Sequence, residues 1–285
     1  MSRHYDLHAH STASDGTLTP GELVARARAR GVDVLALTDH DDVSGIAEAS
    51  RAAEAQGIEL VPGIELSVTW SGMTVHIVGL HVDPACERLL DGIRRQQAFR
   101  HWRAAEIARR LEKKGIPGAA AGARDFANGP IVSRTHFARY LVAQGHADSV
   151  REVFKRYLVK GKPGYVAGDW AGLEEVMDWI HAAGGLAVVA HPARYRLSAT
   201  RLRRLLGEFR ELGGVALEVV SGSHSRDECR YMAELAGRFE LAASCGSDYH
   251  GPEQPYVELG RLQALPASCL PVWRSPAWPA ARGAA

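Results

Sequence analysis

The chain has 285 residues, close to the size at which one hydrophobic core stops growing, so we expect one large domain with room for an inserted subdomain. Its 34 Lys and Arg nearly balance its 33 Asp and Glu, and the net charge of +1 excludes a uniformly basic nucleic-acid coat protein and a highly charged disordered chain. Four cysteines without a CxxC pair argue against a disulfide framework and against a thiolate zinc site.

The first ten residues, MSRHYDLHAH, contain Arg, His and Asp where a secretory signal peptide has its apolar stretch. No apolar run reaches the ~18 residues that a membrane span requires. We therefore expect a cytoplasmic protein that does not bind a membrane, and nothing in the sequence indicates an obligate protein partner. Histidine is abundant, with 13 copies, so a metal site in this chain should use nitrogen and oxygen ligands.

Short apolar runs alternate with segments of helical periodicity, a pattern typical of a parallel α/β sheet or barrel. A helix should begin after Thr19, because Thr is a good N-cap, Pro20 suits the first helical position and Glu22 completes a capping box. Two of the strands should form a hairpin through the Ser71-Gly72 turn. The expected strands are residues 5–8, 34–38, 59–61, 66–70, 73–80, 186–190, 216–220 and 241–244.

Residues 94–165 break this alternation, since they show long helical patterns and no convincing strand. The segment has 16 Lys and Arg against 5 Asp and Glu, a net charge of +11 that leaves −10 for the rest of the chain. A basic insertion on an acidic frame suits a site that holds cations and binds a polyanion beside them, although most of these charges should cover solvated helix faces. We expect a discontinuous barrel of residues 1–93 and 166–265, an inserted helical subdomain of residues 94–165, and a surface-following or partly disordered tail of residues 266–285.

Nine acidic or imidazole side chains lie at or near the ends of the expected strands, and in a parallel barrel the C-terminal strand ends meet at one rim. One such histidine alone would more often be a hydrogen-bonded core or loop residue. Nine are costly to bury together without cations, and since one ion takes three or four protein ligands, they indicate two or three divalent ions. The candidate metal ligands are His8, His10, Asp15, His40, Glu65, His76, His191, Asp248 and His250.

The motifs that carry these residues are DLHAHSTASDGTLTP, LALTDHDDVSG, GIE, VHIVGL, VVAHPA and GSDYH. They resemble the polymerase and histidinol phosphatase (PHP) family of metal-dependent phosphoesterases from residue 3 to about residue 250, with all nine ligand positions filled. The resemblance implies a distorted (β/α)7 barrel of the PHP type that holds a trinuclear centre. It assigns one ion to His8, His10, Glu65 and Asp248, a second to Glu65, His76 and His191, and a third to Asp15, His40 and His250.

The SDG of the opening motif and the segments SRTHFARYLV and KGKPGYV are similar to the branch that includes nucleoside 3',5'-bisphosphate phosphatases and a related 5'-to-3' exoribonuclease. This resemblance implies removal of the 3'-phosphate from a nucleoside 3',5'-bisphosphate, giving the 5'-monophosphate, by a hydroxide that bridges the ions. Mn is the first expectation for the metal, with Fe and Zn as alternatives. The main alternative activity is exonucleolytic trimming of short 5'-phosphorylated RNA or DNA. Histidinol phosphate hydrolysis and a catalytically silent metal-binding module are less favoured, because of the insertion and the complete ligand set respectively.

The insertion should bind the rest of the substrate. Arg134, in the sequence SRTH at the start of a helical segment, has a planar guanidinium group suited to phosphate, and Ser133 and His136 would add hydrogen bonds. Lys160 and Lys162 flank a glycine in a turn-rich segment and form a second cationic pair. The expected substrate ligands are therefore Ser133, Arg134, His136, Lys160 and Lys162.

His224 lies in SGSHS, after the strand of residues 216–220, and is a candidate general acid for the leaving oxygen or a contact for the base. A loop histidine with neither role is the alternative. Glu218 should be a residue of the core or rim, and Asp41 and Asp42 should be loop or cap residues that could also support a ligand.

Overall fold

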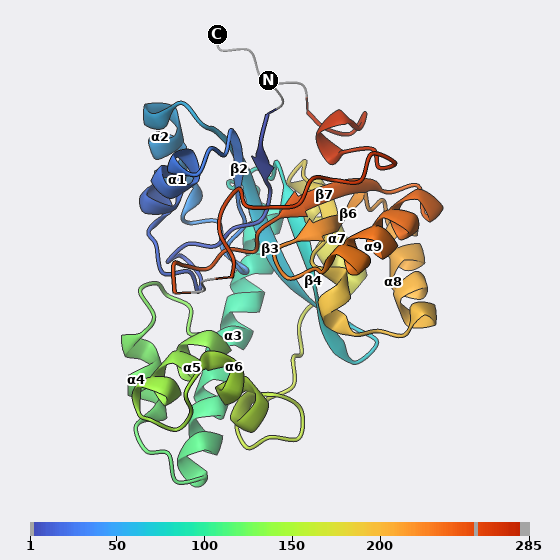
Figure 1. The fold of residues 1–285 in the computed structure, drawn as a ribbon. Coiled ribbons are helices and arrows are strands. Elements are labelled where there is room, and N and C mark those ends of the chain that lie inside the picture. Colours follow the sequence, from blue (N-terminus) through green and yellow to red (C-terminus); the bar gives the residue numbers. More distant parts are fainter. Residues whose placement is uncertain (1–2, 254–255, 280–285) are drawn as a thin grey trace.

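The computed structural model describes residues 3–253 and 256–279. Seven strands form one sheet in sequence order (Figure 1). The first and last strands also meet, because the backbone N–H of Leu7 donates to Cys245 O at 2.9 Å and that of Asp248 donates to His8 O at 2.9 Å. These contacts nearly close the sheet into a barrel, which confirms the predicted α/β barrel of seven strands.

The fourth strand runs antiparallel to both of its neighbours, and the other paired strands run parallel. The hairpin through Ser71-Gly72 is confirmed. The division of residues 59–70 into two strands is wrong, because β3 pairs with β2 through its first residues and continues without a break to pair with β4. The strands are β1 Tyr5–Asp6, β2 Val34–Leu37, β3 Glu59–Trp70, β4 Met73–Leu80, β5 Leu186–Val189, β6 Ala216–Ser221 and β7 Ala242–Gly246.

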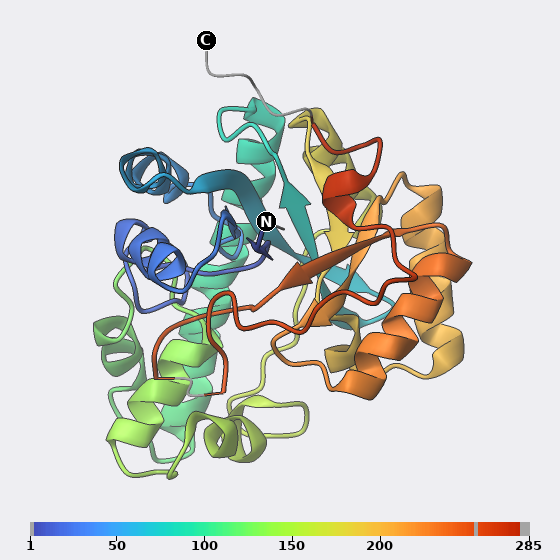
Figure 2. The same cartoon turned by 45° about the horizontal axis from the view of Figure 1, so that its top comes forward.

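Helices cover the barrel on two sides: α1 and α2 lie against the first strands, and α7, α8 and α9 lie on the opposite side (Figure 2). The predicted capping box at the start of α1 is confirmed, since Glu22 N donates to Thr19 Oγ1 at 3.2 Å and Thr19 N donates to Glu22 Oε2 at 2.8 Å. No described helix is long and apolar enough to cross a membrane. The α-helices are α1 Pro20–Ala29, α2 Ile46–Gln56, α3 Glu87–Lys113, α4 Ala119–Asp125, α5 Arg134–Ala143, α6 Val150–Val153, α7 Leu173–Ala182, α8 Ala199–Glu211 and α9 Arg226–Arg238.

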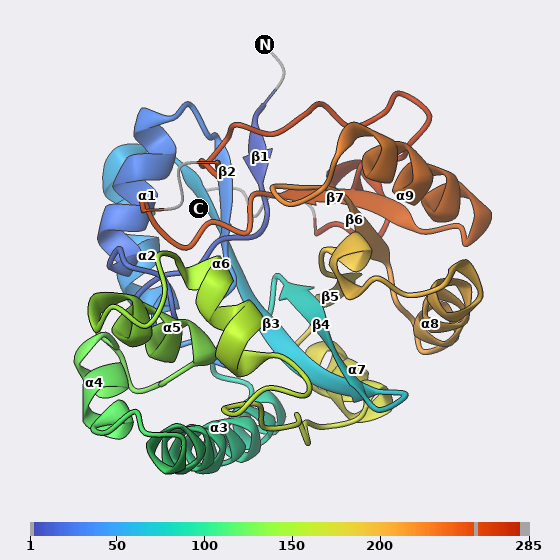
Figure 3. The same ribbon diagram turned by 60° about the horizontal axis from the view of Figure 1, so that its bottom comes forward.

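A helical lobe, formed by the C-terminal half of α3 with α4, α5, α6 and the π-helical turn Phe154–Leu158, lies beyond one end of the barrel (Figures 1 and 3). The helix α3 belongs to both parts. Leu89 and Ile93 pack into the barrel cluster, whereas Ile107 and Leu111 pack into a separate apolar cluster of the lobe. The expected boundary at residue 94 therefore falls inside one continuous helix.

The segment expected to be a surface-following tail packs against the barrel as far as Trp278. Ala243 N donates to Leu270 O at 2.8 Å, Val272 is fully buried, and Trp273 stacks on Tyr5 with ring centroids 4.0 Å apart. Residues 280–285 lie outside the described part of the chain.

Candidate metal centre

All nine predicted metal ligands meet at the end of the barrel that the helical lobe faces. His8 and His10 follow β1, and their Nε2 atoms lie 3.1 Å apart. Both atoms are 3.3 Å from Glu65 Oε2, and the Nε2 atom of His10 is 3.2 Å from Asp248 Oδ1. These four buried side chains offer one nitrogen or oxygen each within 4.8 Å of one another, the spacing that a single ion needs.

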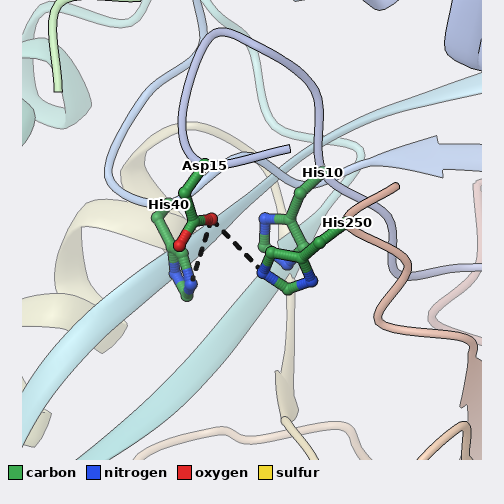
Figure 4. Close-up of side chains that lie close together, drawn as sticks. All are labelled: His10, Asp15, His40 and His250. Atoms are coloured by element: carbon green, nitrogen blue, oxygen red, sulfur yellow. Dashed lines mark ion pairs between the residues drawn. The ribbon is translucent and has the colours of Figure 1, made fainter. Parts of the chain in front are cut away.

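In a second group, three imidazoles, those of His10, His40 and His250, surround the carboxylate of Asp15 (Figure 4). Asp15 Oδ1 lies 3.2 Å from His250 Nε2 and 3.9 Å from His40 Nε2. His10 faces the same space, with its ring stacked on that of His250 at a centroid distance of 4.2 Å. The structure thus brings together Asp15, His40 and His250, as the resemblance implied, and adds His10 to them.

The third group is centred on the other side of Glu65. Glu65 Oε1 lies 2.8 Å from His76 Nδ1 and 2.9 Å from His191 Nε2, and Glu65 Oε2 lies 2.9 Å from His40 Nδ1. Glu65 was expected at a strand end, and that placement is wrong. It lies in the middle of β3, because β3 runs on for five residues to pair with β4.

The nitrogen and oxygen atoms of the site are better arranged to bind divalent ions than to form hydrogen bonds with one another. Within the described part of the chain, His10 Nδ1, Asp15 Oδ1 and Glu65 Oε2 are buried and have no hydrogen-bond partner. Buried polar atoms without partners are costly, and divalent ions bound among them would remove that cost. The set contains imidazole and carboxylate and no thiolate, which suits Mn, Fe or Zn.

The charges of the site favour metal-binding protonation states for some of its ligands but not for all, because the carboxylates of Asp15 and Asp248 outweigh burial and raise the pKa of His250 to about 9. Burial alone would raise the pKa of Glu65, but the neighbouring His40, His76 and His8 hold it well below its usual range. Burial and the nearby charge of His250 lower the pKa of His10 to about 3, and burial lowers the pKa of His76 to about 4. Ionised carboxylates and neutral imidazoles are the forms that bind cations.

Backbone strain accompanies two of the candidate ligands. Asp248 has φ +56° and His191 has φ +27°, a region that residues other than glycine enter infrequently. His191 is held there in part by its backbone N–H, which donates to Glu218 Oε2 at 2.5 Å. Strain of this kind persists only where surrounding contacts impose it, and it is concentrated at functional sites.

Glu218 supports the site and was not predicted as a functional residue. Its Oε1 lies 2.6 Å from His8 Nδ1, so it fixes the ring of His8 with Nε2 turned toward Glu65. A carboxylate that orients a ligating imidazole in this way also raises its basicity. The signal in the sequence was available, because Glu218 is the one charged residue in β6, which is buried along its whole length.

The helical lobe supplies further contacts to the site through the start of α5. Ser133 Oγ and Thr135 Oγ1 each donate to Asp15 Oδ2 at 3.0 Å. From the barrel-side part of α3, Arg100 pairs with Asp41 at 2.5 Å and donates to Ser67 Oγ at 3.0 Å. Asp41, expected in a loop or as a cap, therefore joins α3 to the segment that carries His40.

A pocket extends from the candidate metal ligands to the lobe, and it is rich in arginine. Arg100, Arg103, Arg134 and Arg194 all line it. Arg194 pairs with Asp248, whereas Arg103 and Arg134 form no ion pair within the described residues and Arg103 donates to the carbonyl oxygen of Val166. Burial and the charges of Arg134 and Arg100 lower the pKa of Arg103 to about 9. Cations crowded in this way without an acidic partner form a site for an anion.

The predicted substrate ligands are not all found in this pocket. Ser133 and Arg134 line it. Lys160 and Lys162 are exposed and do not line it, and His136 is buried with its Nδ1 accepting from Ser133 N at 2.9 Å.

His224, the predicted general acid, is buried outside the pocket lining, with its Nδ1 3.2 Å from Val219 O. Burial lowers its pKa, which favours the neutral ring.

Comparison with known proteins agrees with this site. Residues 6–186 match the PHP domain. A 3',5'-nucleoside bisphosphate phosphatase of Chromobacterium violaceum is 47% identical over 270 residues, which cover 94% of this chain and 95% of that protein. The 5'-3' exoribonuclease Rnm of Escherichia coli K12 is 47% identical over 272 residues, which cover 95% of this chain and 92% of that protein.

Two solved structures share the fold. An amidohydrolase from Chromobacterium violaceum, with bound sulfate and no metal, matches with a TM-score of 0.92 and 47% identity over 95% of both chains. A protein from Bifidobacterium adolescentis described as a metal-dependent phosphoesterase matches with a TM-score of 0.80 and 27% identity over 95% of this chain and 93% of that one. The chain therefore belongs to the PHP domain family, and it is a metal-dependent phosphoesterase of the hydrolase class.

Proposed function

We propose that this protein removes the 3'-phosphate from nucleoside 3',5'-bisphosphates and releases the nucleoside 5'-monophosphate. The observation that carries the proposal is a single pocket lined both by six of the nine candidate metal ligands and by two arginines that have no acidic partner among the described residues. A monophosphate needs only the first of these features, whereas a bisphosphate uses both. A relative that is 47% identical and carries the name of this activity adds support.

We further propose that the site holds two or three divalent ions, with Mn preferred over Fe and Zn. Asp248 and Asp15 would belong to different groups of ligands, and Glu65 would be shared between the group of Asp248 and the group that contains His76. When bound, such ions neutralise phosphoryl charge and lower the pKa of a coordinated water enough for it to act as a nucleophile near neutral pH.

The chain's own residues orient the substrate. Arg134 would bind the 5'-phosphate, with Ser133 beside it at the start of α5. Arg194 pairs with Asp248 and lines the pocket, so it is placed to contact the phosphate that is cleaved. Lys160, Lys162, His136 and His224 keep only their sequence-based predictions, since none of them lines the pocket. A cytoplasmic location also stays a prediction.

The direct test is release of inorganic phosphate from adenosine 3',5'-bisphosphate by the purified protein with Mn²⁺. Asp248→Asn should abolish this release and keep the fold, because Asn removes a charged ligand and still tolerates the positive φ of this position.

Arg134→Ala should reduce kcat/KM on the bisphosphate at least ~10-fold, because a charge-assisted bond to phosphate is lost. The same substitution should reduce kcat/KM far less on an aryl phosphate.

Two results would contradict the proposal. Unchanged turnover by Asp248→Asn would show that the metal-ligand assignment is wrong. Equal losses on the two substrates in Arg134→Ala would show that this arginine does not bind the second phosphate.

Exonucleolytic cleavage of short 5'-phosphorylated RNA is the second candidate function, and the relatives named as 5'-3' exoribonucleases favour it. Both activities need a group that binds a terminal 5'-phosphate, so the arginines do not separate them. Comparison of kcat/KM on the bisphosphate and on a 5'-phosphorylated trinucleotide does. A large preference for the trinucleotide would replace the phosphatase as the main activity.

A further inference from the structure

The pocket contains one side chain whose chemistry differs from all the others. Apart from Phe154, every described residue that lines it carries a nitrogen or oxygen on its side chain. The ring of Phe154 packs partly against the apolar cluster of the lobe and remains partly exposed toward the pocket, where a ligand with an apolar face would cover it favourably. The ring takes no part in the phosphate contacts proposed above.

The backbone around Phe154 is irregular at this point. The helix α6 ends at Val153, and residues Phe154–Leu158 form a π-helical turn in which Val159 N donates to Phe154 O at 3.1 Å. Such turns are rare and occur frequently at functional sites, because the extra residue changes the direction in which side chains point. Here the turn begins with the residue that lines the pocket.

A second aromatic ring of the pocket, that of Trp170, already packs against the arginines. It is 5% exposed, and its indole N–H donates to Thr74 Oγ1 at 3.1 Å. The guanidinium groups of Arg100 and Arg103 lie 5.0 and 5.3 Å from its ring centroid. Trp170 therefore holds the arginines in place, and it has little ring surface left for a ligand.

Phe154 lies beside the arginine that we assign to the 5'-phosphate. The guanidinium carbon of Arg134 lies over the Phe154 ring, 5.6 Å from its centroid, as the arginines do over Trp170, but the Phe154 ring is partly exposed whereas that of Trp170 is buried. In a nucleotide the 5'-phosphate and the base are joined through one ribose, so a protein that binds both needs a cation and an apolar platform as neighbours. Arg134 and Phe154 are such a pair, one from α5 and the other from the turn after α6.

We propose that Phe154 is the platform on which the nucleobase of the substrate stacks. This inference rests on the proposed function for the identity of the substrate, and it makes Phe154 a specificity-determining residue. Since every base has a π face, the contact selects nucleotides over sugar phosphates without selecting one base strictly. Purines, which have the larger face, should bind more tightly than pyrimidines.

The test measures binding, so it does not depend on turnover. The dissociation constants of adenosine 5'-monophosphate and ribose 5-phosphate are measured by calorimetry in the presence of Mn²⁺, and their ratio reports the contribution of the base. Phe154→Leu keeps an apolar side chain beside Arg134 but lacks a π face, and it should reduce this ratio about tenfold. Phe154→Trp restores a π face and should return the ratio to the wild-type value or above.

A ratio that stays at the wild-type value in Phe154→Leu would overturn the inference, as would a ratio that falls equally in Phe154→Trp. Equal weakening of both ligands in Phe154→Leu would also overturn it, because the ring would then serve only to support Arg134. Failure of the proposed function gives a different result: the wild-type protein would bind the nucleotide in preference to the sugar phosphate but would release no phosphate from the bisphosphate.

Discussion

Glu65 is the residue on which the site is centred, since its two carboxylate oxygens lie within 3.3 Å of ring nitrogens from five histidines. It is fully buried in the middle of a strand. An isolated carboxylate would not stay charged there, and the surrounding imidazoles are the reason that it does. One side chain thus links all three groups of candidate ligands.

Glu218 allows a test by a single substitution. Its carboxylate contacts His8 and the backbone N–H of His191 and is not itself a candidate metal ligand. Glu218→Gln should weaken Mn²⁺ binding roughly 10- to 100-fold, since the amide supports the ring of His8 less well than the carboxylate does. Competition with a metal chelator measures the affinity. Glu234→Gln, on the exposed face of α9, is the matched control and should bind metal as the wild-type protein does. Equal affinities in the two variants would contradict the role of Glu218.

The nine candidate ligands could be predicted from the sequence, because most of them follow apolar runs that read as strands. The supporting residues could not. Asp41 meets Arg100 across 59 positions, and Glu218 meets His8 across 210. Such partners depend on how the lobe and distant strands pack in space, and no local pattern in the sequence encodes that packing. Phe154 was missed for the same reason.

At the scale of elements, α3 packs against α7 through a glycine. A Cβ added to Gly92 would lie 2.4 Å from the ring of Trp179, which cannot move aside because it is buried. Gly92→Ala should therefore lower the free energy of unfolding by about 1–3 kcal/mol, the usual cost of overpacking.

The helix α8 provides the control for this substitution. A Cβ at Gly207 would meet only Phe239, at an ordinary contact distance of 3.8 Å. Gly207→Ala should raise the free energy of unfolding by about 0.5–1 kcal/mol, because alanine favours the helix. Urea denaturation measures both changes. Equal effects of the two substitutions would show that Gly92 is not a packing contact.

The start of α5 gives a prediction about pH. Burial, opposed by Asp15 and assisted by Arg139, lowers the pKa of His136 to about 4 from its ordinary value near 6.5. The folded state thus favours the neutral ring, so this stabilisation is present above pH 6.5 and is lost as the pH falls toward 4. Between pH 7 and pH 5 the loss amounts to about 2 kcal/mol.

His136→Gln keeps an acceptor for Ser133 N and removes the titrating group. The free energy of unfolding of this variant should consequently fall less than that of the wild-type protein between pH 7 and pH 5. Urea denaturation at the two pH values gives the difference. An identical decrease in both proteins would show that His136 carries its ordinary pKa.

Prediction of elements was accurate where the local signal was strong and failed where pairing extended a strand. The capping box at Thr19 and the turn at Ser71-Gly72 depend on residues that are close in sequence, and both are confirmed. The single strand β3 was divided because Pro62-Gly63 interrupts its apolar pattern. In the structure, Gly63 lets the chain pass Thr38, whose Cγ2 would lie 2.8 Å from an added Cβ.

For the whole molecule, the metal ions should stabilise a barrel that already folds without them. The barrel has its own apolar clusters, and the carboxylates of the site are paired with imidazoles and arginine. Treatment with a chelator should therefore lower Tm and leave the far-UV circular dichroism nearly unchanged. Addition of Mn²⁺ at about 100 times its Kd should restore about 2.7 kcal/mol of stability. Complete unfolding on chelation would contradict this expectation.

Because α3 is one continuous helix, it restricts where this chain can gain or lose residues during evolution. At ~1.5 Å per residue its 27 residues form one rod of about 40 Å, with barrel contacts at one end and lobe contacts at the other. One residue inserted in the middle of this helix would rotate the residues that follow it by ~100° about the helix axis. Arg103 would then point away from the pocket. Length variation is therefore tolerable after residue 113, in the turn that follows the rod, and not within the rod itself.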